Sequence, residues 1–241
     1  MTTAVIPAYR AADELLAGAI RRAVHTYGVP TSIDAAHNLS AAVMPDLLDA
    51  RGYLAAREAE SLRALFPNLS VQSQAPWYPE TALQKMTLRA AGLAPNSPLT
   101  RVELYSESAQ KMMTVRAAPW TLPDEETMLN VLTDRLVAGA GRHARSASRD
   151  LVIATAKGNR VPWARQLNGE SCTFCAMLVS RGAVYSEESV RFPAHDHCDC
   201  TATLAPGDQW EGVDQAALLR EAWTSSDSLA AFGDKVREVV A

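Results

Sequence analysis

All four cysteines of this chain lie within one short segment, and the same segment contains two of the five histidines. Cys172 and Cys175 form a C-x-x-C element, and after 19 intervening residues comes the run His195-Asp196-His197-Cys198-Asp199-Cys200. Two thiolates separated by two residues hold one side of a tetrahedral zinc ion, and a second Cys/His pair completes such a site. The spacing therefore predicts a structural zinc knuckle. Its ligands would be Cys172 and Cys175 with two of His195, His197, Cys198 and Cys200, and the spacing does not choose among those four.

Two other chemistries stay open for the same residues. A redox C-x-x-C element normally lies between the strand and the helix of a βαβ unit, and the sequence around Cys172 lacks the rest of such a unit. A nucleophile taken from the four cysteines would need His195 or His197 as its base. The sequence contains no H-E-x-x-H, G-x-S-x-G, P-loop or G-x-G-x-x-G motif, so no catalytic residue is assigned.

Before residue 157, apolar residues recur at three- and four-residue spacing, which predicts helices. Leu15, Leu16, Ile20 and Val24 would share one face of a helix over 8–27, which Gly28 and Pro30 end. Further helices are expected over 32–65 with a break or kink at Pro45, and over 80–92, 100–117, 124–139 and 142–156. The acidic triplet 124–126 is interpreted as a helix cap and not as a catalytic carboxylate pair.

After residue 156 the composition changes to Gly, Pro, Cys, His and Asp. We therefore predict a mainly α N-terminal region over 1–156, a small α+β C-terminal module over 157–212 built around the Cys/His knuckle, and a C-terminal helix over 213–241. With 48% hydrophobic and 21% charged residues, the composition is that of a globular protein. No run approaches the roughly 20 apolar residues of a membrane helix, so we expect a cytoplasmic protein without membrane contact.

The cysteine segment resembles the C-terminal signature of phage Mu F-like minor head proteins, and it is most similar to versions from phages of actinobacteria. In that family a C-x-x-C element precedes an H-x-x-C-x-C element, and His195, Cys198 and Cys200 fall on the second pattern. His197 departs from the pattern as an additional candidate ligand. The resemblance covers about residues 163–206.

The resemblance implies a minor capsid or head morphogenesis protein that acts in prohead assembly next to the portal. Its partners would be the portal protein and the scaffold or major capsid protein, in the host cytoplasm during assembly and then inside the phage head. Related actinophage proteins are often named capsid maturation proteases. A cysteine-dependent protease that trims scaffold or capsid protein is therefore the alternative function, and a DNA-binding regulator with a zinc knuckle is a third.

A local excess of basic residues adjoins the cysteine segment. Between residues 135 and 165 there are seven basic residues and one acid, Asp150, in a chain whose net charge is −4. Arg142, Arg145 and Arg149 have the spacing i, i+3, i+7, which places them on one face of a helix. We expect this face to bind phosphates of packaged DNA or an acidic portal surface. A solvated face without a partner is the simpler alternative.

Overall fold

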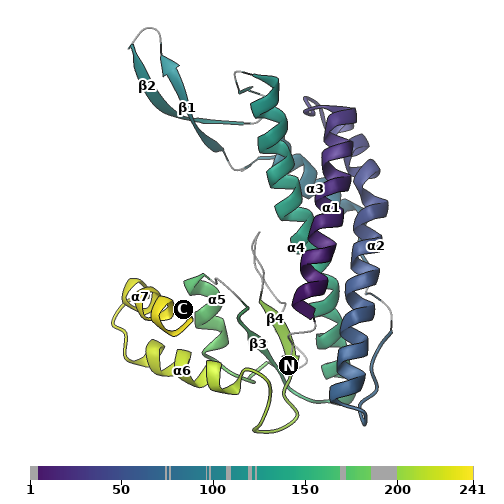
Figure 1. Ribbon diagram of the computed structural model, residues 1–241, viewed down its shortest axis with the longest axis vertical. Helices are drawn as coiled ribbons and strands as arrows, with labels where there is room; N and C mark the ends of the chain where they lie inside the picture. The colour runs from purple at the N-terminus through teal and green to yellow at the C-terminus, as the bar shows by residue number, and fades with distance from the viewer. Residues whose placement is uncertain are drawn as a thin grey trace. The chain divides into compact units, whose positions relative to one another are not determined.

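The computed structural model describes residues 5–73, 75, 77–95, 97, 99–106, 110–118, 121–122, 124–168, 172–185 and 200–240. The element order is α1 (Val5–Tyr27), α2 (Ile33–Leu65), α3 (Glu80–Ala91), β1 (Thr100–Ser106), β2 (Lys111–Ala117), α4 (Glu125–Asn159), β3 (Trp163–Gln166), α5 (Thr173–Val179), β4 (Thr201–Leu204), α6 (Val213–Thr224) and α7 (Leu229–Val240) (Figure 1). The fold is mainly α with a small α+β part near the C-terminus, as the sequence predicts. Among the described residues, no helix is long and apolar enough to cross a membrane.

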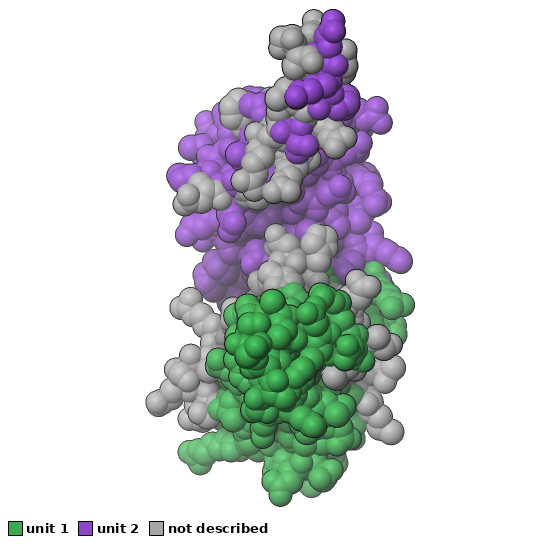
Figure 2. All heavy atoms as spheres, turned by 90° about the vertical axis from the view of Figure 1, so that its left-hand side faces the viewer, with its two compact units in different colours: residues 1–10, 51–76, 144–241 green, residues 11–50, 77–143 purple. Residues whose placement is uncertain are grey.

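The chain forms two compact units, which Figure 2 colours separately. Unit 1 contains residues 1–10, 51–76 and 144–241, and unit 2 contains residues 11–50 and 77–143. Helices α1, α2 and α4 each contribute residues to both units. The domain boundary expected near residue 157 lies inside unit 1, which contains all of residues 144–241.

Unit 2 contains most of the helical region expected from apolar spacing. Leu16, Ile20 and Val24 are buried on α1, and Gly28 ends that helix with a φ of 69°. Leu15, which we expected on the same face, is 70% exposed. The break expected at Pro45 does not occur, because α2 continues through it from Ile33 to Leu65.

The two helices expected over 124–139 and 142–156 form the single helix α4. Asp124 caps its start, because one carboxylate oxygen accepts the backbone N–H of Thr127 at 2.7 Å. Gly139 lies inside the helix and against α3, where a Cβ would come within 2.7 Å of the Met86 sulfur. This glycine permits a close approach of two helices and does not end one.

The prediction of a helix over 100–117 is wrong, because this segment forms the antiparallel strands β1 and β2. The register pairs Val102 with Val115 and Leu104 with Met113. These apolar residues lie two apart on each strand, which is the strand period, and β-branched residues favour strands. Gln110 provides the positive φ of 49° between the strands.

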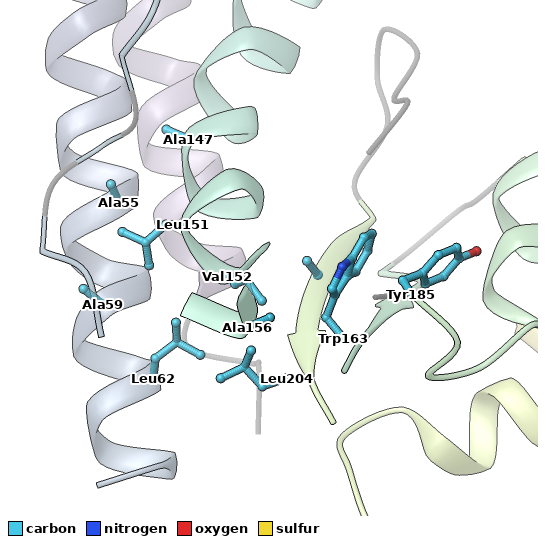
Figure 3. Close-up of a cluster of buried hydrophobic side chains, with 11 residues drawn as sticks. Ala55, Ala59, Leu62, Ala147, Leu151, Val152, Ala156, Trp163, Tyr185 and Leu204 are labelled. Atoms are coloured by element: carbon cyan, nitrogen blue, oxygen red, sulfur yellow. The ribbon is translucent and has the colours of Figure 1, made fainter. Parts of the chain in front are cut away.

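In unit 1, β3 and β4 form an antiparallel pair that packs against α2 and α4. Trp163 on β3 stacks on Tyr185 with ring centroids 4.7 Å apart (Figure 3). The same apolar cluster continues through small and aliphatic side chains of the two helices and of β4: Ala55, Ala59, Leu62, Ala147, Leu151, Val152, Ala156, Ala202 and Leu204. The C-terminal half of α4 is therefore part of the same apolar core as β3 and β4.

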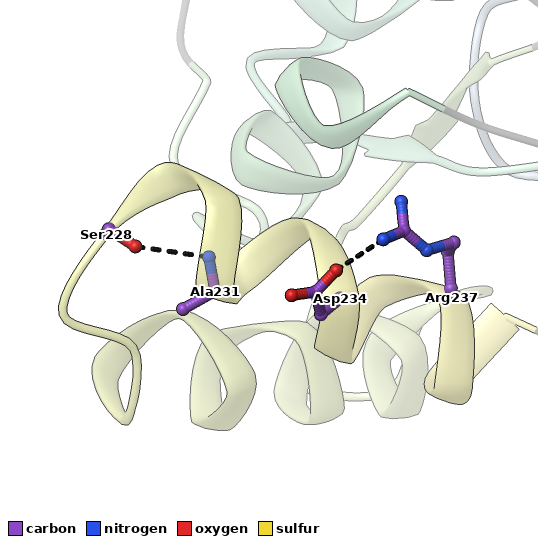
Figure 4. A network of polar contacts seen from close by, with 4 residues as sticks. All are labelled: Ser228, Ala231, Asp234 and Arg237. Carbon is purple, nitrogen blue, oxygen red and sulfur yellow. Dashed lines mark hydrogen bonds and ion pairs between the residues drawn. The ribbon is translucent and has the colours of Figure 1, made fainter.

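The single C-terminal helix expected over 213–241 is two helices, α6 and α7. The hydroxyls of Ser225 and Ser226 donate to the carbonyls of Glu221 and Ala222, each at 2.7 Å, and so satisfy the last turn of α6. Ser228 then caps α7, where its hydroxyl accepts the N–H of Ala231 at 3.1 Å (Figure 4). Serine side chains that compete for backbone groups end one helix and begin the next.

Candidate functional site

The C-x-x-C element opens helix α5. Cys172 is the N-cap residue, with extended φ and ψ, and its sulfur accepts the backbone N–H of Cys175 at 3.4 Å. Cys172 is half-buried, whereas Cys175 in the first turn is 1% exposed. The first cysteine therefore lies at the surface of the local core and the second lies inside it.

Cys200 directly precedes strand β4 and is 1% exposed. Its carbonyl oxygen accepts a hydrogen bond of 2.8 Å from Nε of Arg149, which is itself 1% exposed. A guanidinium from α4 thus fixes the backbone of the last cysteine. Bonds of this kind, from a charged donor, are stronger than those between neutral groups.

The structure brings Cys172, Cys175 and Cys200 into one apolar cluster, although 27 residues separate the first from the last. The cluster also contains buried side chains of α5, α6 and α7: Ala176, Val179, Ala216, Leu219, Ala222, Phe232 and Val236. His195, His197 and Cys198 lie outside the described residues.

The donor set fits zinc in its chemistry, since thiolate and imidazole are the ligands that structural zinc sites use. Within the described ranges, however, no three His, Cys, Asp or Glu side chains are grouped as a metal ion would require. A four-ligand site would need His195, His197 or Cys198 in addition to Cys172, Cys175 and Cys200. The zinc knuckle stays a prediction.

Two of the three residues of the expected arginine face are buried. Arg145 is 6% exposed and Arg149 is 1% exposed, and Arg142 is half-buried. The Arg145 guanidinium carbon lies 6.0 Å from the centroid of the Tyr9 ring, and Arg149 bonds to Cys200. Helical spacing placed these residues on one face, and the two of them that belong to unit 1, Arg145 and Arg149, are in the interior of that unit.

A buried polar cluster in unit 1 was not found from the sequence. The Ser148 hydroxyl on α4 donates to Oε2 of Glu58 on α2 at 2.6 Å, and the Tyr9 hydroxyl on α1 lies 3.1 Å from the Ser148 oxygen. Burial, together with the negative charge of Glu211, raises the pKa of Glu58 to about 7 against the opposing effect of the Ser148 hydrogen bond. Burial also raises the pKa of Tyr9 to about 12.

One sequence signal could have located this cluster. Glu58 occupies a position on α2 four residues after Leu54 and four before Leu62, both of which are buried. An acid on the apolar stripe of an amphipathic helix is rarely solvated, and it then needs a polar partner inside the core.

The comparisons with known proteins bear on the whole chain. Searches of curated proteins and of solved structures gave no match. The family described as VG15 protein matches residues 3–225, a range that includes both cysteine elements and parts of both units. The chain therefore belongs to the VG15 protein family, a family of viral gene proteins, and this membership indicates that the protein is encoded by a phage.

Proposed function

We propose that this protein is a minor capsid protein for phage head morphogenesis, acting in prohead assembly next to the portal. The observation that carries the proposal is the cysteine cluster. In a chain of a viral family, the C-x-x-C element and the last cysteine of the Mu F-like pattern share one apolar core with α5, α6 and α7. The alternative, a cysteine-dependent maturation protease, is less favoured because Cys175 and Cys200 are each 1% exposed.

The cysteine segment would act by holding structure together. Cys172 and Cys175 would bind zinc together with two of His195, His197, Cys198 and Cys200. Zinc bound there would supply a cross-link between the start of α5 and the segment that leads into β4. Such a cross-link contributes to folding where a loop-rich segment has too few apolar residues.

The proposed partners are the portal protein and the scaffold or major capsid protein. Packaged DNA is the weaker candidate, because phosphate contacts require accessible guanidinium groups and the side chains of Arg145 and Arg149 are buried.

Zinc is tested by elemental analysis of the full chain, purified without a tag under reducing conditions. We expect about one zinc ion per chain, and we expect the double variant His195→Ala/His197→Ala to lose part or all of it. The matched control is His25→Ala, an exposed histidine on α1, which should retain the metal. A wild-type chain without stoichiometric zinc would contradict the knuckle.

The assembly role is tested by co-expressing the portal, scaffold and major capsid proteins of the same genome with and without this chain. We expect the chain to co-purify with proheads through the portal, and the scaffold to remain intact. Absence from purified proheads would contradict the proposal. Scaffold cleavage that a Cys172→Ala variant abolishes would establish the protease instead.

A further inference from the structure

Three helices of unit 1 meet at a hydrogen-bonded chain of side chains. Tyr9 comes from the second turn of α1, Ser148 from α4 and Glu58 from α2. The Ser148 hydroxyl has a single proton, which it donates to Glu58, so the Tyr9 hydroxyl must be the donor to Ser148. The chain therefore runs in one direction, from α1 through α4 to α2, and ends on a carboxyl group.

This carboxyl group is inside the protein. Glu58 is 3% exposed, Tyr9 3% and Ser148 1%. Ala55 and Ala59, on either side of Glu58 along α2, belong to the apolar cluster of unit 1. An ionised carboxylate in such surroundings is disfavoured unless charges and hydrogen bonds compensate for the lost water.

The charged and titratable groups around Glu58 compensate only in part. From α4 come Arg145 and Arg149, whose positive charges act on Tyr9, and from α1 comes Tyr9 itself. The Nε–H of Arg149 is engaged by the carbonyl of Cys200. Glu211, in the segment before α6, adds a negative charge that acts on Glu58.

We propose that Glu58 is a proton-operated latch that holds the first turns of α1 against α2 and α4. With the proton bound, the carboxyl is neutral and stays buried at the end of the chain of hydrogen bonds from Tyr9. When the proton leaves to water, a buried negative charge remains, and separating α1 from the other two helices lets water reach it. The latch uses no cysteine, so it is independent of the proposed zinc knuckle.

The position of Glu58 makes this latch responsive near neutral pH. Its pKa of about 7 in the closed state contrasts with the ordinary value of 4.5 that it regains when exposed. Between these two values the closed state holds one proton more than the open state. The opening equilibrium should therefore rise about tenfold per pH unit from pH 5 to pH 7 and level off above pH 7.

The test is hydrogen exchange of the full chain, read by mass spectrometry in peptides covering residues 5–12 and corrected for the intrinsic exchange rate. Protection in the wild type should fall about tenfold per pH unit up to pH 7 and then become constant. Glu58→Gln should show no such slope. The matched control is Glu60→Gln on the same helix, an exposed carboxylate paired with Arg57, which should keep the wild-type slope.

A second variant keeps the proposal testable if Glu58→Gln does not fold. Ser148→Ala removes a hydrogen bond that lowers the pKa of Glu58, so the pH at which protection becomes constant should move upward. Wild-type protection that is independent of pH, or a slope that persists in Glu58→Gln, would overturn the latch. The same holds if ¹³C-carboxyl NMR finds Glu58 titrating in the ordinary range of an exposed glutamate.

Discussion

Replacing Arg149 with methionine removes the guanidinium that holds the backbone of Cys200. Methionine matches the length and much of the volume of the arginine stem, so the change affects the hydrogen bond more than the packing. In the wild type, Nε of Arg149 donates to the Cys200 carbonyl at 2.8 Å, and both residues are 1% exposed.

The expected cost follows from these contacts. A hydrogen bond from a charged donor contributes about 1.5–3 kcal/mol to stability. The cost of leaving the buried Cys200 carbonyl without a donor is of similar size, and the two figures describe the same loss, so they do not add. Relief of the buried positive charge offsets part of this loss. We therefore expect Arg149→Met to destabilise unit 1 by about 2 kcal/mol, and we expect the Cys200 thiol to become more accessible.

Two measurements check this expectation on the full chain. Urea unfolding gives the stability change, and alkylation followed by mass spectrometry gives the protection of the Cys200 thiol. Arg142→Met is the matched control, because it removes the same charge from the same helix at a half-buried position. If Arg149→Met unfolds at the wild-type urea concentration and leaves Cys200 equally protected, the assigned role of Arg149 is wrong.

Three further predictions concern stability. Because the pKa of Glu58 is raised from 4.5 to about 7, the protonated side chain stabilises the folded state fully below pH 4.5, and this stabilisation of about 3 kcal/mol is lost as the pH rises to 7. The free energy of unfolding in urea should therefore fall between pH 5 and pH 8, and it should fall less for Glu58→Gln. Gly139→Ala should destabilise the protein by about 2 kcal/mol and lower the melting temperature, since the new Cβ would lie 2.7 Å from the Met86 sulfur. Gly52→Ala, with open space around the new Cβ, should raise the melting temperature. Ser228→Ala removes the cap of α7 and should cost about 1 kcal/mol, and hydrogen exchange should detect the loss in α7 without a matching loss in α3.

The helices of this chain could largely be predicted from sequence, because apolar spacing reports directly on which residues are buried. Leu16, Ile20 and Val24 on α1 follow this rule. The cap expected from the acidic residues at the start of α4 is also present, at Asp124. The errors arose where one residue type has two physical uses. Gly139 was interpreted as a helix end, but it serves a close contact with Met86.

The strands β1 and β2 were missed for a related reason. Between two proline-containing breaks, the segment 100–117 holds apolar residues whose spacing fits a helix as well as two short strands. Strand pairing decides between the helix and the two strands. The pairing of Val102 with Val115 joins residues 13 apart in the sequence, and apolar spacing within a short window does not report it. The cysteine elements, by contrast, were expected from their spacing to lie together, and Cys172, Cys175 and Cys200 do share one apolar cluster.

The basic run illustrates why a charge pattern does not by itself identify a binding face. On α4, each residue from Ala144 to Ala156 is buried or half-buried, so this part of the helix has no solvent-exposed side. Small and aliphatic residues on several sides of the helix, such as Ala144, Ala147 and Val152, are the sequence counterpart of that burial. Where a helix is enclosed in this way, its charged residues must find partners inside, as Arg149 does at Cys200. One of the residues that suggested a surface for phosphates, Arg149, therefore holds the cysteine segment against the helix.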